Sequence, residues 1–328
     1  MLVLARADVE RLLPPAVAID AVERAFVTYA RGQATVPPRG VLGVDDGVLL
    51  LMPAATFGAS GAGESLGAKL VSVFDGNRRH GRPTLYATYL LLDGRTGEPL
   101  ALLEGASLTG IRTGATSALA ARWLARPDAR RVVCFGTGAQ ARWQLACLAA
   151  VRPIERVTVV GRDPAKARAF ATETAERLGV PVTVADDPRR AVREADLVTC
   201  ATTAREPVVF GTDLQPGAHL DLVGAFRPTD READTEAVRR ARVVVDTYAG
   251  ALTEAGDLLL PLKEGAITRD HIAAELGEIV TGARPGRRRP DDITLFKSVG
   301  WALEDLVTAR LAWERARREG VGREVPLW

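Results

Sequence analysis

A glycine-rich turn after an apolar run constrains the fold of this chain more than any other feature. The run Val132–Phe135 is followed by Gly136-Thr137-Gly138-Ala139-Gln140-Ala141 and then by a helical pattern of apolar residues. In a Gly-x-Gly-x-x-Ala turn, the first glycine permits a tight bend, the second leaves room for a pyrophosphate, and the small third residue packs helix on strand. The helix N-terminus attracts phosphates. The turn therefore predicts a dinucleotide-binding unit, with Gly136, Gly138, Ala139 and Gln140 at the cofactor.

Strand and helix patterns alternate after this turn. Apolar, β-branched runs occupy residues 157–160, 182–184, 197–201, 219–223 and 243–246, and helical patterns rich in charged residues separate them. Continuous apolar runs are typical of parallel strands that are buried on both faces. We therefore predict the fold class as α/β, with a central Rossmann-type, doubly wound parallel sheet. Because the turn begins only at residue 136, another part of the chain has to bind the substrate.

In a dinucleotide-binding unit, the residue after the second strand, here the run 157–160, distinguishes the two nicotinamide cofactors. An acidic residue there binds the ribose 2′-hydroxyl of NADH, whereas an arginine accommodates the 2′-phosphate of NADPH. The sequence has Arg162 at this point, and Asp163 precedes Pro164, so Asp163 suits the N-cap of the next helix. We predict NADPH as the favoured cofactor, with NADH as the alternative. The alternative for Arg162 itself is a solvated side chain in an arginine-rich protein.

Composition excludes several classes of function. The formal net charge is +2, with 43 basic and 41 acidic residues, which leaves no basic stripe for nucleic acid. The run Arg287–Arg289 lies between prolines and acids and is predicted to be a solvated loop. The three cysteines lack metal-ligand spacing and indicate a reduced, cytoplasmic interior, and no long apolar span predicts a membrane segment. We expect no nucleic-acid partner, no membrane association and no metal site.

Lysine is rare in this chain, which draws attention to Lys69. Only Lys69, Lys166, Lys263 and Lys297 are lysines among the 43 basic residues. Lys69 lies in the strand-like segment 66–73, which is otherwise apolar. A buried ammonium is costly unless it is paired or has a function. We predict a functional role for Lys69; the alternative is a lysine at the edge of a strand that reaches water.

A second cation lies shortly before the glycine turn. The segment 108–119 places Arg112 among small and hydroxyl-bearing residues, and we predict that it forms an anion-receptive turn at the start of a helix. Arg39, after Val36-Pro37-Pro38, is a third cation in the N-terminal half. If the fold brings Arg39, Lys69 and Arg112 together, they define a pocket for a carboxylate.

Five ordered segments together resemble the ornithine cyclodeaminase/mu-crystallin family. They are residues 67–70 (Gly-Ala-Lys-Leu), 77–84, 109–113 (Thr-Gly-Ile-Arg-Thr), 136–140 (Gly-Thr-Gly-Ala-Gln) and 294–300 (Thr-Leu-Phe-Lys-Ser-Val-Gly). The resemblance covers nearly the whole chain. It implies a homodimer in which a mixed α/β domain, residues 1–115 with 299–328, supplies substrate binding and the dimer contact. Residues 116–298 are then the dinucleotide-binding Rossmann domain.

The resemblance also implies roles for individual residues. It implies that Arg39, Lys69 and Arg112 bind the carboxylate of an α-amino or α-imino acid, with Lys69 as the catalytic candidate. Ser298 and Val299 are expected to border the pocket. The cofactor-binding candidates beyond the glycine turn are Thr84 and Arg112 near the nicotinamide, together with Thr113, Arg162, Thr202 and Val223.

One position separates the reactions within this family. The position aligned with Phe226 is an aspartate in cyclodeaminases, where it acts as acid and base, and a phenyl ring cannot move protons. The segment from Gly224 to Asp234 is also similar to reductases of Δ1-pyrroline-2-carboxylate and Δ1-piperideine-2-carboxylate, which give proline and pipecolate. Reduction of a cyclic imine needs mainly an anchored carboxylate and correct positioning. We therefore predict an NAD(P)H-dependent cyclic ketimine reductase.

Alternatives remain open on the sequence alone. Phe226 can instead pack in a core beside an acid such as Asp221 or Asp230. A second alternative is an ornithine or lysine cyclodeaminase, or an enzyme like alanine dehydrogenase, which has the same fold. A third is a non-catalytic, NADPH-dependent binding protein of the mu-crystallin kind, which holds its ligand without turning it over.

The helix from Val299 to Arg318 is predicted to be an ordinary amphipathic helix with its charges opposite its apolar face.

Overall fold

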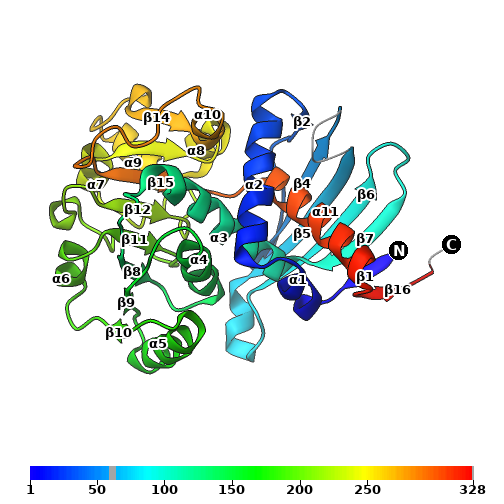
Figure 1. The fold of residues 1–328 in the computed structure, drawn as a ribbon, viewed down its shortest axis with the longest axis horizontal. Helices are drawn as coiled ribbons and strands as arrows, with labels where there is room; N and C mark the ends of the chain where they lie inside the picture. Colours follow the sequence, from blue (N-terminus) through cyan, green and yellow to red (C-terminus); the bar gives the residue numbers. More distant parts are fainter. Residues whose placement is uncertain (59–63, 327–328) are drawn as a thin grey trace. The chain divides into compact units, whose positions relative to one another are not determined.

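The chain folds into two compact units in a computed structural model that describes residues 1–58 and 64–326. One unit comprises Met1–Arg112 with Trp301–Trp328, and the other comprises Thr113–Gly300 (Figure 1). The boundaries predicted from the sequence lie within a few residues of these positions. Each unit contains its own eight-stranded sheet.

The first unit is built on a mixed sheet. Its strands are β1 (Leu2–Leu4), β2 (Ala34–Thr35), β3 (Gly40–Val44), β4 (Gly47–Thr56), β5 (Ser65–Phe74), β6 (Leu85–Asp93), β7 (Pro99–Glu104) and β16 (Arg323–Glu324). Its helices are α1 (Arg6–Leu12), α2 (Pro15–Ala30), the 3₁₀ helix η1 (Asp75–His80), the first half of α3 (Gly105–Leu124) and α11 (Ala302–Glu319). The strand order is β16-β1-β7-β6-β5-β4-β2, with β3 paired to β4. β1 and β7 are parallel, whereas β4, β5, β6 and β7 pair antiparallel.

Alternation along β5 decides which of its side chains face helices. Lys69 and Val71 are buried, whereas Leu66 and Leu70 on the opposite face are exposed. α11 packs against β4, β5 and β6 and against α2, so the helices cover the face that carries Lys69 (Figure 1). The period of two that defines a strand therefore places this lysine in the interior of the unit.

The second unit is built on a parallel sheet. Its strands are β8 (Arg131–Phe135), β9 (Arg156–Val160), β10 (Val182–Val184), β11 (Leu197–Cys200), β12 (His219–Leu222), β13 (Arg242–Val245), β14 (Ile272–Glu275) and β15 (Thr294–Lys297). Its helices are α4 (Ala139–Ala149), α5 (Pro164–Leu178), α6 (Pro188–Arg193), α7 (Thr235–Arg240), α8 (Tyr248–Glu254), α9 (Gly256–Lys263) and α10 (Leu276–Val280), with the 3₁₀ helices η2 (Gly211–Asp213) and η3 (Arg269–His271). The strand order is β10-β9-β8-β11-β12-β15-β13-β14.

Alternate residues of β8 face two separate cores. Val132 and Cys134 pack with apolar residues of α4 and α5, whereas Val133 and Phe135 pack with apolar residues of α7, α8 and α9. Helices therefore cover both faces of the sheet, which confirms the predicted doubly wound α/β class. Because both faces are buried, the strands read as continuous apolar runs.

The strand order places a switch point beside the glycine turn. β8 lies between β9 and β11, so the order of the strands reverses there. In open parallel sheets, ligands bind outside the carboxyl ends of the strands at such a point. β14 and β15 were not among the predicted strands. β15 is the last strand of this sheet in sequence order but is inserted between β12 and β13, so Lys297 and Ser298 lie at the same end of the strands as the glycine turn.

One prediction about a helix was wrong, and another was wrong in part. The segment 108–119 lies inside α3, which begins at Gly105, so its amide groups are part of the helix rather than an anion-receptive turn. Interior helical amides already donate to carbonyl groups one turn back. In α11, Glu304 and Asp305 are both fully buried, so these charges do not lie on a solvated face.

Candidate functional site

The glycine turn between β8 and α4 leaves space beside its backbone. Gly136 has a φ of +112°, and a Cβ there would lie 2.5 Å from the carbonyl oxygen of Ala201, so only glycine fits. A Cβ on Gly138 would meet nothing within 4 Å. Within the described residues, no side chain caps α4 at Gly138, so amides of its first turn keep hydrogen-bonding capacity for a ligand. This turn fits the pyrophosphate of a dinucleotide.

Glu232 joins the two loops that follow β11 and β12. Its buried carboxylate accepts hydrogen bonds from the amide and hydroxyl of Thr202, at 2.8 and 2.7 Å, and from the amide of Gly224 at 2.7 Å. The amide of Val223 donates to the carbonyl oxygen of Cys200 at 3.0 Å. The predicted cofactor residues Thr202 and Val223 therefore lie in neighbouring loops at the switch-point edge. Glu232 positions these loops, a role that the sequence analysis did not assign.

A buried lysine provides the positive charge beside Glu232. Lys297, at the end of β15, forms an ion pair with Asp257 at 2.7 Å and donates to the carbonyl oxygen of Ala225 at 2.5 Å. Asp257 also accepts the amides of Glu232 and Ala233, at 2.7 and 3.0 Å. Burial raises the pKa of Glu232, and the charge of Lys297 opposes that rise. Lys297, Asp257 and Glu232 thus form one buried network under the loops after β11 and β12.

Asp246 fixes the segment that leaves β15. Its Oδ2 accepts the hydroxyl of Ser298 at 2.9 Å and the amides of Val299 and Gly300 at 2.8 and 3.0 Å. Asp246 directly follows β13, the strand that pairs with β15. Ser298 and Val299, predicted to border the substrate, are therefore held in place by a carboxylate from the adjacent strand.

At the end of β9, Arg162 is available to a ligand, whereas the carboxylate of Asp163 is occupied in capping α5. Oδ1 of Asp163 accepts the amides of Ala165 and Lys166 at 2.9 and 3.1 Å and so caps α5. The capping bond from Lys166 contributes most to lowering the pKa of Asp163. Arg162 is exposed, and its Nη2 lies 3.4 Å from the hydroxyl of Thr203.

Lys69 in the first unit is an interior cation. It is 1% exposed, and its Nζ donates to both carboxylate oxygens of Asp305, at 2.8 and 2.9 Å, and to the hydroxyl of Thr109 at 3.1 Å. These contacts exclude the alternative of a lysine that reaches water. Burial lowers the pKa of Lys69 from 10.5 to about 8, and the charge of Asp305 opposes that shift. Lys69 is consequently still protonated at neutral pH.

Arg112 shares the acid that pairs with Lys69. From α3, its Nε donates to Asp305 at 3.0 Å and its Nη1 to Glu304 at 2.8 Å. The charge of Arg112, and more weakly that of Arg39, acts to lower the pKa of Lys69 against the effect of Asp305. The fold of the first unit thus joins Lys69 and Arg112 through Asp305, and Arg39 acts on Lys69 through its charge.

Three predicted residues lie outside these networks. Thr84 precedes β6, and its carbonyl oxygen accepts the amide of Phe74 at 2.8 Å. Thr113 is buried in α3 at the start of the second unit. Phe226 is 42% exposed in the loop after β12, with the guanidinium of Arg227 at 5.7 Å from its ring centroid. This exposure excludes the alternative that Phe226 packs in a core.

The sequence analysis missed Glu304 and Asp305. The available signal was indirect: a lysine in an apolar strand requires a buried partner, and adjacent acids near the start of a helix rich in leucine and alanine were candidates. Among the residues that the structure describes, no group of His, Cys, Asp and Glu side chains could hold a metal ion. In the same residues, no helix is long and apolar enough to cross a membrane.

Comparison with known proteins places this geometry in a family. The sequence profile of the ornithine cyclodeaminase/mu-crystallin family matches residues 1–320. A Δ1-pyrroline-2-carboxylate reductase of Bacillus cereus is 40% identical over 328 residues, which are 99% of each chain.

Two solved structures superpose on nearly the whole chain. One is the Δ1-pyrroline-2-carboxylate reductase of Thermococcus litoralis in complex with NADH and L-proline, with a TM-score of 0.95, 43% identity, and 99% of this chain and 100% of that chain covered. The other is an archaeal alanine dehydrogenase dimer with bound NAD, with a TM-score of 0.93, 32% identity, and 100% and 99% of the two chains covered.

Proposed function

Because the chain belongs to the ornithine cyclodeaminase/mu-crystallin family, we propose that it reduces a cyclic ketimine carboxylate with NAD(P)H. The substrate is Δ1-pyrroline-2-carboxylate or Δ1-piperideine-2-carboxylate, and the product is proline or pipecolate. The observation that carries the proposal is that two buried cations, Lys69 and Arg112, both donate hydrogen bonds to Asp305. It occurs in a chain that is similar, over nearly its whole length, to reductases of the five-membered imine.

The cations of the first unit are proposed to bind the substrate carboxylate. Lys69 and Arg112 are positively charged groups of this buried cluster, and the charge of Arg39 also acts on Lys69. The ion pairs with Glu304 and Asp305 hold Lys69 and Arg112 in fixed positions before the substrate binds. Such preorganised charges cost little reorganisation when the ligand arrives.

The proposed reaction adds one hydride and one proton across the C=N bond. When bound, the reduced nicotinamide supplies the hydride to the imine carbon. Lys69 has a pKa of about 8, so its ammonium holds a proton at neutral pH and is the candidate donor to the ring nitrogen. The glycine turn, Thr202 and Val223 are the candidates for holding the dinucleotide. In the second unit, Phe226 offers an apolar surface that suits ring methylenes.

A second candidate function is oxidative deamination of alanine. The similarity to the archaeal alanine dehydrogenase favours it, because both reactions join a hydride to the carbon of an imino acid. An assay separates the two: an alanine dehydrogenase reduces NAD⁺ with L-alanine and releases ammonia, whereas the proposed reductase oxidises NAD(P)H with the cyclic imine and releases none.

We further propose that NADPH is the preferred cofactor, on the evidence of Arg162 and the engaged Asp163. Replacing Arg162 by alanine is then expected to raise the KM for NADPH about tenfold, because a charge-assisted bond to the 2′-phosphate is lost, with little change for NADH. Initial rates with both cofactors measure the effect. Arg168→Ala removes an exposed arginine from α5 and serves as the control. Unchanged NADPH kinetics in Arg162→Ala would show that Arg162 is merely solvated.

We also propose that the chain forms a homodimer through the open face of the first sheet. By the strand register, the large apolar side chains that are exposed on the face opposite Lys69 are Leu42, Val44, Leu51, Leu66, Leu70 and Tyr86. An apolar patch of this extent on a sheet face is typical of a protein interface. Light scattering would give twice the chain mass of 35.0 kDa for the dimer, and the chain mass itself would contradict the proposal.

A further inference from the structure

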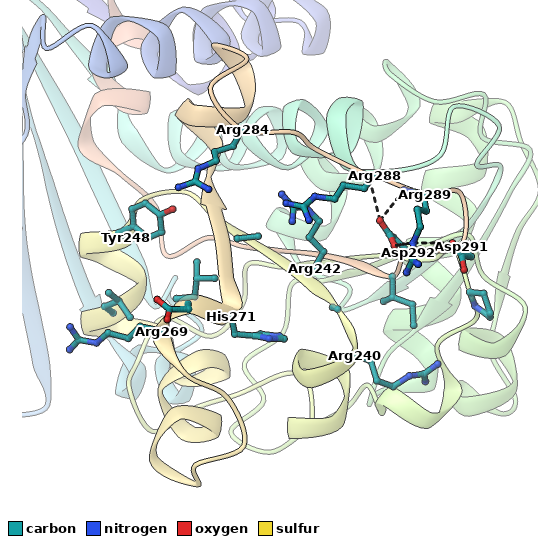
Figure 2. A pocket seen from close by; sticks show the side chains of 17 residues that line it. Arg240, Arg242, Tyr248, Arg269, His271, Arg284, Arg288, Arg289, Asp291 and Asp292 are labelled. Atoms are coloured by element: carbon teal, nitrogen blue, oxygen red, sulfur yellow. Dashed lines mark hydrogen bonds and ion pairs between the residues drawn. The ribbon is translucent and has the colours of Figure 1, made fainter.

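The second unit contains a large cavity beside β13 and the edge strand β14. The cavity has a volume of about 1210 Å³ and is lined by residues at the starts of β13, β14 and β15, by α8 and by the segment 284–292 (Figure 2). Its lining includes none of the glycine turn at residues 136–141 and none of the loops after β11 and β12 that Glu232 joins. The cavity is therefore separate from the dinucleotide site.

Arginines dominate the charged lining of this cavity. They are Arg240, Arg242, Arg269, Arg284, Arg288 and Arg289. The lining aspartates, Asp270, Asp291 and Asp292, are fewer, so the lining carries a net positive charge. Tyr248, Leu252 and Ile272 add apolar surface at the same wall. A concave site of this size with arginines and apolar surface is suited to a small organic anion.

Three of these guanidinium groups interact through their charges. Burial lowers the pKa of Arg242, the charge of Arg288 adds to that effect, the charge of Asp292 opposes it, and Arg284 adds a smaller lowering. Figure 2 shows Arg288 extending toward Arg242, whereas Arg284 extends toward Tyr248 at the other end of the cavity. The repulsion among these groups is a cost that a bound multivalent anion would remove.

The structure fixes some of these arginines and leaves others available. Arg242 donates to the carbonyl oxygens of Gly286 and Pro285, at 2.9 and 2.8 Å, so its position is set by the backbone. The nearest carboxylate to Arg284 is Glu278, at 3.8 Å. In residues 1–58 and 64–326, the guanidinium of Arg288 makes no hydrogen bond or ion pair. One arginine is thus rigid, and its two neighbours keep donors for a ligand.

The expectation of a solvated arginine loop at residues 287–289 was wrong in part. Arg287 donates to the carbonyl oxygens of Leu124 and Gly217, at 2.7 and 3.1 Å, and to the hydroxyl of Thr294 at 3.1 Å. These bonds anchor the segment to α3 and to β15. Because Arg287 fixes the backbone, Arg288 is presented to the cavity from an ordered segment.

We propose that this cavity binds a phosphate-bearing small anion, either a free polyphosphate or the phosphate chain of a nucleotide. Guanidinium groups recognise phosphate through paired, charge-assisted hydrogen bonds, and Arg242, Arg284 and Arg288 supply such donors from three directions. Tyr248 and Leu252 provide the apolar wall that distinguishes a nucleotide from a free polyphosphate.

Isothermal titration calorimetry tests the proposal with inorganic tripolyphosphate and, in a second arm, with ATP in the absence of divalent cations. NADP⁺ and NAD⁺ are both present throughout, so that the glycine turn is occupied. The variant Arg284→Gln/Arg288→Gln removes two charges from the cavity. The variant Arg31→Gln/Arg318→Gln removes two charges from exposed positions in the first unit and is the matched control.

We expect one site per chain, with affinity weakened about tenfold or more in the cavity variant and changed less than about twofold in the control. Tighter binding of ATP than of tripolyphosphate would identify a nucleotide, and the reverse would identify a free polyphosphate. Equal weakening in both variants would show that bulk charge alone attracts the anion and would overturn the proposal. The absence of saturable binding would also overturn the proposal. Binding of a single-stranded oligonucleotide without binding of tripolyphosphate would overturn it as well.

Discussion

Replacing Lys69 by methionine is expected to lower kcat/KM for the cyclic imine at least about a hundredfold, which corresponds to about 2.7 kcal/mol of transition-state stabilisation. Methionine keeps most of the side-chain volume on β5 but removes the ammonium that Asp305 and Thr109 hold. Asp305 then loses one of its two cations and retains Arg112. The site loses one positive charge, so the substrate carboxylate is bound less tightly.

A comparison of substrates separates this role from a purely structural one. The ring imine Δ1-pyrroline, which lacks the carboxylate, should lose activity in Lys69→Met only through the missing proton donor. Its loss should therefore be smaller than that of the carboxylate-bearing imine, which loses the proton donor and the carboxylate contact together. Lys263→Met, at an exposed position on α9, is the control for the substitution itself. Equal losses with both imines would remove carboxylate binding from the role of Lys69. A fall in kcat with both would instead assign Lys69 to proton supply alone.

The pKa of Lys69 also predicts a pH profile. Its ammonium is charged below about pH 8 and neutral above, so kcat/KM should fall as the pH rises through this value. Lys69→Arg keeps its charge at alkaline pH and should move the alkaline limb upward, even if its overall rate is low. An unchanged alkaline limb in Lys69→Arg would assign the titration to another group.

Replacing Lys297 by methionine is expected to destabilise the protein by about 3–5 kcal/mol, because a buried charge loses its partner. Lys297 and Asp257 are both 0% exposed and lie 2.7 Å apart, and Glu232 is fully buried beside them. At about 2–4 °C per kcal/mol for a protein of this size, the Tm should drop on the order of 10 °C. Differential scanning calorimetry measures the change.

Two controls identify the buried charge as the cause. Burial raises the pKa of Glu232 and Lys297 opposes that rise, so without Lys297 the folded protein should bind a proton on Glu232 more readily than the unfolded chain does. The lost stability should then return in part as the pH falls. The double variant Lys297→Met/Asp257→Asn removes the charge of Asp257 but keeps an oxygen to accept the amides of Glu232 and Ala233. It should be more stable than Lys297→Met alone. A deficit that is the same at every pH would indicate lost packing instead.

The parts of the fold that depend on local pattern were predictable. The glycine turn, the parallel strands of the Rossmann unit and the cap at Asp163 all follow from neighbouring residues, because turn geometry, burial on two faces and capping are local properties. β15 was not recognised as a strand. Its insertion between β12 and β13 depends on pairing between segments far apart in the sequence.

The charge partners in the site were less predictable than the cations themselves. Lys69 was conspicuous as an ion in an apolar strand, but Asp305 lies 236 residues away, and only the packing of α11 on β5 brings them together. Glu232 and Asp246 were likewise overlooked, because a buried carboxylate that accepts backbone amides has no pattern of its own in the sequence. The error at residues 108–119 had another source: small residues typical of a turn also allow close packing inside a helix.

The most direct test of the account is the loss of NADPH absorbance when the purified protein meets freshly generated Δ1-pyrroline-2-carboxylate. Parallel traces use NADH, and separate reactions contain L-alanine with NAD⁺ or ornithine with NAD⁺. The account predicts rapid oxidation with the cyclic imine, formation of proline, and no ammonia from ornithine. Silence with both five- and six-membered imines, together with ammonia release from ornithine or from alanine, would contradict it.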